Sequence, residues 1–390
     1  MSISPKFLFD CLWSGGVRFF SGVPDSLLKH FCAYVDAEVP SENHIIAANE
    51  GGAIALAAGH FLATSRVPLV YLQNSGLGNT VNPLVSLADP GVYSIPMILL
   101  VGWRGRPGVR DEPQHVKQGA VTGSMLDSMG IPWQEVPGEE KQAEDAITWA
   151  FGTCRERQGP VVLLVHEKTF SEYSTGEPLS LTGAGMSREE AIAIISQNLP
   201  ESGIVVGTTG MISRELYEGR SRRGEARDRD FLTVGSMGHA SQIALGISQS
   251  LPDLNVTCLD GDGAVLMHMG GLAVVGTTKP SNLLHVVLNN GVHDSVGGQP
   301  TAARRMSLTD VARACGYEVV EEPEGSPEGL KKTIRRLVSL PGKRFLEVFV
   351  RPGHRNDLGR PQESPIENRD KLISFLRDHD SKAPQPEVAG

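Results

Sequence analysis

Unbroken apolar runs are the feature that most constrains the fold of this chain. Residues 67–72 (VPLVYL), 95–101 (IPMILLV) and 159–165 (GPVVLLV) show no alternation of apolar and polar side chains. Strands that are buried on both faces of a parallel sheet have this pattern. Because helical patterns separate the runs, the sequence predicts right-handed crossovers and a doubly wound α/β fold.

The same alternation of strands and helices occurs twice along the chain. In the first half we expect strands at 17–20, 44–47, 68–72, 96–101 and 160–166, and helices at 25–37, 50–64 and 141–155. In the second half we expect strands at 204–206, 231–234, 256–260, 283–289 and 344–350, and helices at 238–250, 265–276, 308–315 and 328–339. Two doubly wound parallel-sheet domains follow, with no third domain between them.

A segment rich in Ser, Thr, Gly and Pro separates the two series. We place domains at 1–170 and 187–350, a linker at 171–186, an irregular extension at 351–378 and a disordered tail at 379–390. Ser187 and Glu190 predict a capping box at the first helix of the second domain. The Arg-rich stretch at 218–230 is interpreted as a solvated loop.

Charge and cysteine usage exclude several classes of protein. Thirty-six basic and 45 acidic residues give a net charge of −9, which disfavours nucleic-acid binding. The 5 cysteines form no CxxC pair, so neither a disulfide framework nor a zinc site is expected. No signal peptide or membrane span is predicted, and we expect a cytoplasmic protein.

Two polar motifs follow neighbouring predicted strands of the second half. Gly261, Asp262, Gly263 and Ala264 come after one strand, and Asn289-Asn290-Gly291 ends another. Ligands of open α/β sheets bind at the carboxyl ends of strands, and Mg²⁺ prefers oxygen ligands shared with phosphate groups. Each motif alone is an ordinary turn sequence. Together they favour a metal–diphosphate site.

GDG followed by NN at this spacing resembles the cofactor motif of the thiamine-diphosphate-dependent decarboxylases. The resemblance implies that Asp262, Asn290 and the carbonyl of Val292 bind Mg²⁺. It also places Thr208, Thr209 and Gly210 at the diphosphate. Gly235, Ser236 and Met237 would lie at the aminopyrimidine, with Met237 bending the cofactor.

The resemblance extends to the first half, where NEGGAIALAAGHFLAT matches the segment that carries the family's glutamate. Glu50 would then hydrogen-bond the pyrimidine. The alternative is an acid in the first turn of a helix, favoured by the helix dipole. The rest of this helix is largely Gly, Ala and Leu, small enough to pack against a second copy. The family builds its site between subunits, so we expect a homo-oligomer, at least a dimer.

Asp25 and His115 are the remaining catalytic candidates that the resemblance implies. Asp25 is alternatively an acid at a helix start, and His115 alternatively a surface residue of a loop that follows a strand. Four cations lie in the same stretch: Arg104, Arg106, Arg110 and Lys117. They are either solvated or form a pocket for a dianionic substrate group, which Arg binds through paired hydrogen bonds.

The two-domain arrangement resembles the 2-oxo-acid decarboxylases of this family whose substrates carry a second anionic group, a phosphonate or a sulfonate. We therefore expect a carboxy-lyase that uses thiamine diphosphate and Mg²⁺ on a small 2-oxo acid. The alternative of another class is a non-catalytic, diphosphate-binding regulatory protein. No nucleic acid or membrane is expected as a partner.

Overall fold

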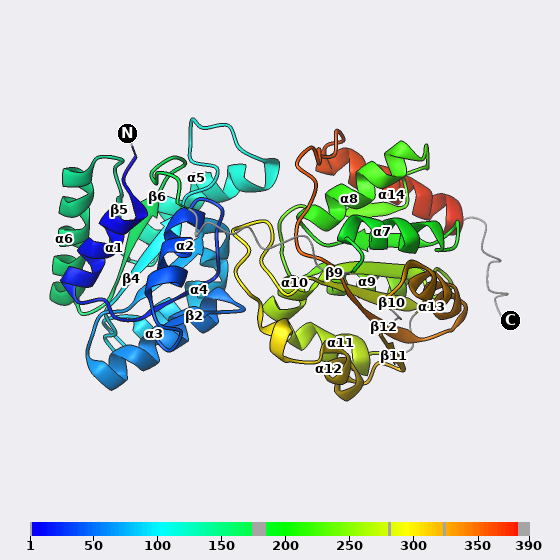
Figure 1. Cartoon of the computed structure of the whole chain (residues 1–390), viewed down its shortest axis with the longest axis horizontal. Helices are drawn as coiled ribbons and strands as arrows, with labels where there is room; N and C mark the ends of the chain where they lie inside the picture. Colours follow the sequence, from blue (N-terminus) through cyan, green and yellow to red (C-terminus); the bar gives the residue numbers. More distant parts are fainter. Residues whose placement is uncertain (1, 174–184, 280–281, 323–324, 381–390) are drawn as a thin grey trace, which may run out of the picture. The chain divides into compact units, whose positions relative to one another are not determined.

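The computed structural model describes residues 2–173, 185–279, 282–322 and 325–380 (Figure 1). The chain divides into two compact units, Met1–Pro178 with His293–Thr301, and Leu179–Val292 with Ala302–Gly390. Each unit contains a six-stranded parallel sheet, which confirms the predicted fold class. The predicted linker and tail fall largely outside the described residues, so the domain boundaries stay predictions.

The sheet of the first unit has the order β2-β1-β3-β4-β6-β5. Its strands are β1 (Phe20–Gly22), β2 (His44–Ile46), β3 (Leu69–Gln73), β4 (Met97–Gly102), β5 (Trp133–Glu135) and β6 (Pro160–Val165). Its helices are α1 (Pro5–Gly15), α2 (Lys29–Glu38), α3 (Glu50–Thr64), α4 (Leu77–Pro83), α5 (Pro113–Ser128) and α6 (Glu140–Arg157), with short turns η1 (Asn74–Gly76) and η2 (Leu84–Ala88).

Successive residues of the central strands belong to different apolar clusters. Leu69 and Tyr71 of β3 join a cluster with α1, α2 and α6, whereas Val70 and Leu72 join a cluster with α3, α4 and α5. Helices therefore cover both faces of the sheet. This double burial is the physical reason for the unbroken apolar runs.

The second unit repeats the plan with the order β11-β12-β10-β9-β7-β8. Its strands are β7 (Ile204–Gly207), β8 (Asp230–Leu232), β9 (Val256–Gly261), β10 (Leu283–Asn289), β11 (Val319–Glu321) and β12 (Lys343–Phe349). Its helices are α7 (Arg188–Gln197), α8 (Met211–Arg222), α9 (Ala240–Ser250), α10 (Asp262–Met267), α11 (Gly270–Thr277), α12 (Leu308–Cys315), α13 (Pro327–Ser339) and α14 (Pro365–Asp380), with the turn η3 (Ala302–Arg305).

The predicted capping box at the start of α7 is confirmed. Ser187 accepts from the backbone N–H of Glu190, whose carboxylate accepts from the backbone N–H of Ser187. The prediction of one helix at 265–276 is wrong, because α10 and α11 divide this stretch. The short strands β5 and β11, each three residues long, were not predicted. Among the described residues, no helix has the length and apolarity needed to cross a membrane.

The prediction of a solvated loop at 218–230 is wrong in part. Residues 218–222 belong to α8, and the Arg220 side chain is fully buried. Its Nε lies 2.6 Å from Oδ2 of the buried Asp230, and its Nη1 lies 3.0 Å from Oε2 of Glu225. Burial raises the pKa of Asp230 to about 6, although Arg220 opposes the shift. The mixed charges of this stretch therefore include a buried ion pair. A buried carboxylate needs such a compensating cation.

The predicted irregular extension at 351–378 is also wrong in part, because α14 begins at Pro365. Ser364 and Glu367 form a second reciprocal cap. The Ser364 hydroxyl accepts from the backbone N–H of Glu367 at 3.2 Å, and the Glu367 carboxylate accepts from that of Ser364 at 2.7 Å. The sequence signal was available, since Ser-Pro-x-Glu combines a capping box with proline at the first helical position.

We predict that Arg220→Ala lowers the free energy of unfolding by about 3–5 kcal/mol, because it leaves the Asp230 carboxylate buried without its cation. The matched control is Arg222→Ala, two residues along the same helix. Its side chain is 52% exposed and pairs with Glu218, so a loss of about 0–1 kcal/mol is expected. Urea denaturation measures both values. Equal losses would contradict a stabilising role for the buried pair.

Candidate active site

Four loops of the second unit meet at one edge of its sheet. Strands β10, β9, β7 and β8 are neighbours in that order and parallel, so their carboxyl ends lie side by side. The ends of these strands and the residues that follow them, including the first turn of α10, contain every residue predicted at the diphosphate, metal and aminopyrimidine. The topology therefore brings these residues to one edge, where open α/β sheets bind ligands.

The loop after β7 contains Thr208, Thr209 and Gly210. Thr208 is buried and its backbone N–H donates to the Leu259 carbonyl at 2.9 Å, which ties the loop to β9. The Thr209 hydroxyl accepts from the Gly235 N–H at 3.0 Å, which ties it to the next loop. Gly210 has a φ of 98° and a Cβ there would meet no atom within 4 Å. Open space next to exposed backbone suits a phosphate group.

The loop after β8 runs through Gly235, Ser236, Met237 and Gly238. Three of them have positive φ, namely Gly235 at 74°, Ser236 at 46° and Gly238 at 85°. A Cβ on Gly238 would lie 2.9 Å from the Ala264 carbonyl and 2.7 Å from the His268 ring. Glycine therefore lets this loop pack against α10. Met237 is half-buried, in keeping with a side chain that supports a ligand.

Asp262 is the first residue of α10 and is 3% exposed. Gly261 and Gly263 flank it, and Ala264 is buried in the next turn. Glu347 of β12, the strand that pairs with β10, is also buried. Burial raises the pKa of Glu347, Asn289 opposes the shift, and the negative charges of Glu322 and Asp262 add to it. The site thus contains two buried carboxyl groups, Asp262 and Glu347, whose charges interact.

The two asparagines after β10 have different roles. Asn289 donates to Glu347 Oε1 at 2.7 Å and accepts from the Gly291 N–H at 2.9 Å. The Asn290 side-chain oxygen accepts from the Val292 N–H at 3.0 Å, and Gly291 has a φ of 69°. This tight turn holds Asn290 and Val292 close together.

These residues fit a divalent cation with a diphosphate. An amide oxygen has a second lone pair, so Asn290 retains the capacity to bind a metal. A buried carboxylate and two neutral oxygens are the hard ligands that Mg²⁺ takes, with phosphate oxygens completing its shell. A divalent cation would also offset the negative charge that Asp262 and Glu347 concentrate there.

The first unit places its candidate acids at the same kind of edge. Glu50 begins α3 after β2, and its carboxyl group is 5% exposed. Asn79 of α4 donates to Glu50 Oε2 at 2.7 Å. Burial raises the pKa of Glu50, and the Asn79 hydrogen bond opposes that shift.

Asp25 follows β1 and is fully buried. It accepts from the Gln73 amide and from the Leu27 N–H, the latter at 3.0 Å. Burial raises the pKa of Asp25, while Gln73, Leu27 and the Arg104 charge oppose the shift. A Cβ on Gly102 would lie 2.1 Å from Asp25 Oδ2, so glycine at the end of β4 makes room for this carboxylate.

His115 lies in the first turn of α5, not in the predicted loop. Its Nδ1 is 3.3 Å from Oδ1 of Asp111, a residue that sequence reasoning missed. Arg104 also pairs with Asp111 (Nε–Oδ2 2.8 Å), and a second nitrogen of Arg104 donates to the Ser26 hydroxyl at 3.0 Å. Although burial opposes it, Arg104 and two backbone N–H groups hold the pKa of Asp111 well below its usual range. The lowered pKa of Asp111 favours its ionised form, so a carboxylate charge lies beside the His115 ring.

The other predicted cations differ in their surroundings. Arg106 pairs with Glu135 at 3.0 Å and lies over the Trp103 ring. Arg110 and Lys117 are exposed, and neither makes an ion pair with any described residue. Two of the four predicted cations are therefore neutralised within the unit, and two retain their full charge for a ligand.

The sequence matches a known family over most of its length. Residues 5–129 match the N-terminal TPP binding domain of the thiamine pyrophosphate enzymes, and residues 206–348 match the C-terminal TPP binding domain. The chain belongs to the thiamine pyrophosphate enzyme family. Thiamine pyrophosphate (thiamine diphosphate), with Mg²⁺ as its partner metal, is therefore its cofactor.

Three curated relatives cover nearly the whole chain. It is 36% identical to the phosphonopyruvate decarboxylase of Streptomyces viridochromogenes, over 96% of this chain and 95% of that one. It is also 36% identical to the phosphonopyruvate decarboxylase of Streptomyces hygroscopicus, over 92% and 90%. The sulfopyruvate decarboxylase of Methanosarcina acetivorans is 29% identical over 87% and 89%. The chain is thus a thiamine pyrophosphate-dependent decarboxylase.

We predict that Asp262→Ala abolishes Mg²⁺-dependent binding of thiamine diphosphate and leaves the unit folded, because it removes the charged ligand that joins metal to diphosphate. Asp253→Ala, at an exposed position of the same unit, is the control and should bind like the wild type. Titration calorimetry with and without Mg²⁺ measures the affinity. Unchanged affinity in Asp262→Ala would contradict the metal assignment.

Proposed function

We propose that this enzyme decarboxylates 3-phosphonopyruvate to phosphonoacetaldehyde and CO₂, as a step of phosphonate biosynthesis. The observation that carries the proposal is the 36% identity to phosphonopyruvate decarboxylases over almost the full length of both chains. The alternative substrate, sulfopyruvate, has weaker support, with 29% identity over less of each chain.

The bound cofactor supplies an electron sink for the carbanion that decarboxylation of a 2-oxo acid leaves behind. In our proposal Asp262, Asn290 and the Val292 carbonyl hold Mg²⁺. The loops at 208–210 and 261–264 bind the diphosphate, and Gly235, Ser236 and Met237 support the pyrimidine. These groups all lie at the carboxyl edge of the second unit.

The first unit would supply the groups that hold and move protons. Glu50 would keep a proton at the pyrimidine nitrogen. Its carboxylate suits this role because it is buried and accepts a hydrogen bond from Asn79. Asp25 or His115 would deliver the proton that completes the product. Burial raises the pKa of Asp25 toward the range in which a carboxyl group is an effective acid. Asp111 would hold the His115 ring in the orientation required for the same task.

The substrate is a dianion or trianion, so its binding requires compensating positive charge. Of the four predicted cations, Arg110 and Lys117 make no ion pair with any residue that the structure describes, which favours them for the phosphonate. Arg104 remains a candidate through its contact with Ser26, beside the buried Asp25. Arg106 is the weakest candidate, because Glu135 already neutralises it.

We predict that wild-type enzyme releases CO₂ faster from phosphonopyruvate than from sulfopyruvate or pyruvate. Arg110→Ala or Lys117→Ala should lower kcat/KM for phosphonopyruvate on the order of 10- to 100-fold, as loss of a charge-assisted contact does, and spare pyruvate. Arg106→Ala is the matched control.

A CO₂-release assay with the three acids measures each ratio. A preference for sulfopyruvate would contradict the assignment of phosphonopyruvate as the substrate. Absence of turnover with all three acids would favour the non-catalytic, regulatory alternative. If each variant lowers kcat/KM for phosphonopyruvate and for pyruvate by the same factor, these cations do not bind the phosphonate.

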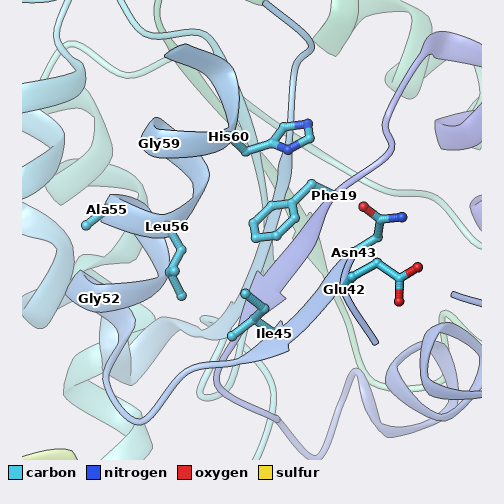
Figure 2. A pocket seen from close by; sticks show the side chains of 9 residues that line it. All are labelled: Phe19, Glu42, Asn43, Ile45, Gly52, Ala55, Leu56, Gly59 and His60. Atoms are coloured by element: carbon cyan, nitrogen blue, oxygen red, sulfur yellow. The ribbon is translucent and has the colours of Figure 1, made fainter. Parts of the chain in front are cut away.

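We also propose that a second copy packs against α3. Gly52, Ala55, Leu56 and Gly59 form one face of this helix, at the three- and four-residue spacing that aligns side chains. Together with Ile45 and Phe19 they line an open hollow of about 520 Å³ (Figure 2). Leu56 and Ile45 are each 37% exposed, and Leu62 of the same helix is 68% exposed. Small side chains beside exposed apolar ones allow two helices to approach closely.

We predict that Leu56→Glu converts the oligomer to monomers, because it places a charge in this face. Ile366→Glu, at a 62% exposed apolar position of α14, is the control and should leave the assembly unchanged. Sedimentation velocity distinguishes the species. An unchanged oligomer in Leu56→Glu would place the interface elsewhere.

A further inference from the structure

Gly76 is a glycine for reasons of space and not of backbone conformation. Its φ is −80°, a value that any residue adopts. A Cβ at this position would lie 2.3 Å from Glu50 Oε1 and 2.5 Å from the Glu50 carboxyl carbon. The carboxylate therefore occupies the volume in which another residue would place its side chain.

A second glycine brings the helix of Glu50 against the helix of Asn79. A Cβ on Gly51 would lie 2.8 Å from the Asn79 carbonyl oxygen, so glycine permits this close approach of α3 and α4. The approach places the Asn79 amide 2.7 Å from Glu50 Oε2. Asn49 caps α3 by accepting from the Gly51 N–H at 2.8 Å, which fixes the backbone from which Glu50 projects.

The two carboxylate oxygens consequently have different surroundings. Oε2 accepts the hydrogen bond from Asn79, whereas Oε1 lies over the bare backbone of Gly76. A carboxylate with one oxygen anchored by an amide is fixed in rotation, and its other oxygen is held in one direction. Proton transfer depends on such alignment, since donor and acceptor must lie about 2.6–3.2 Å apart.

We propose that Asn79 is a positioning residue that, with Gly76, orients Glu50 so that Oε1 is the oxygen offered to the pyrimidine nitrogen. The inference rests on the proposed role of Glu50 at the cofactor. It does not depend on which 2-oxo acid is the substrate. A misplacement of about 1 Å between reacting groups is enough to slow a reaction by on the order of 100-fold.

The test compares two glycines of one segment. Gly76→Ala inserts a methyl group against the Glu50 carboxylate, the flexible end of a side chain, which will rotate away without unfolding the chain. Gly78→Ala is the matched control, because a Cβ there would meet no atom within 4 Å. Asn79→Ala removes the donor, and Asn82→Ala removes an exposed asparagine of the same helix.

The measurements are hydrogen–deuterium exchange at the cofactor C2, cofactor affinity by calorimetry and the unfolding temperature of the cofactor-free protein. We expect Gly76→Ala and Asn79→Ala to slow exchange on the order of 10- to 100-fold, with affinity within about threefold of wild type. Both unfolding temperatures should stay close to those of their controls, Gly78→Ala and Asn82→Ala.

Exchange at the wild-type rate in both variants would overturn the proposal. So would a loss of affinity or stability as large as the loss of exchange, since that result indicates a structural role alone. C2 exchange requires no 2-oxo acid, so the proposal and the proposed substrate fail independently. A wild type that exchanges C2 but does not turn over phosphonopyruvate would refute the substrate and leave the role of Asn79 intact.

Discussion

Burial of both faces of each parallel sheet is the constraint on which the rest of the structure depends. Leu69–Leu72 of β3 alternate between two apolar clusters, and helices cover both. A strand that is covered on both faces is inaccessible to a ligand along its length. Buried polar residues such as Asp260 and His285 do occur within the strands, but the carboxyl ends carry the segments that lead into the helices. Both halves of the chain place their functional candidates there.

The carboxyl edges of the two sheets differ in how their buried carboxyl groups are compensated. The first unit buries Glu50 and Asp25 and compensates each with a side-chain amide, from Asn79 and Gln73. A glycine makes room for each carboxylate, Gly76 for one and Gly102 for the other. The second unit concentrates negative charge at Asp262 and Glu347, where a metal ion would offset it. In our proposal, the edge of the first unit holds protons and the edge of the second unit holds a metal ion.

The sequence predicted those parts of the fold that follow from local pattern. Unbroken apolar runs gave the buried strands, and the loops after β7, β8, β9 and β10 were identified from their glycines and polar residues. The strands β5 and β11 were not predicted; none of their residues is fully buried, and neither strand contains an unbroken apolar run. The Arg-rich segment was misassigned because only tertiary contact with Asp230 distinguishes a buried arginine from a solvated one.

The candidate site was predictable only where a motif names the residue. Glu50 and Asp262 lie in such motifs, but Asp111, Asn79 and Gly76 depend on which segments the fold brings together. His115 was expected in a loop because its segment follows a predicted strand, yet Pro113 is well suited to the first turn of α5. Sequence pattern does not identify the residues that orient a reactive group, because the fold decides which segments meet.

We propose, as the family resemblance implies, that the carboxyl edge of the first unit in one copy and that of the second unit in another together form one catalytic site. Mixing two inactive variants, Glu50→Gln and Asp262→Ala, after dissociation and reassembly tests it most directly. In a mixed dimer one site would combine both intact edges, so equal mixing should restore about a quarter of wild-type CO₂ release. Failure of the mixture to recover activity, with mixed dimers demonstrated by mass spectrometry, would contradict the account.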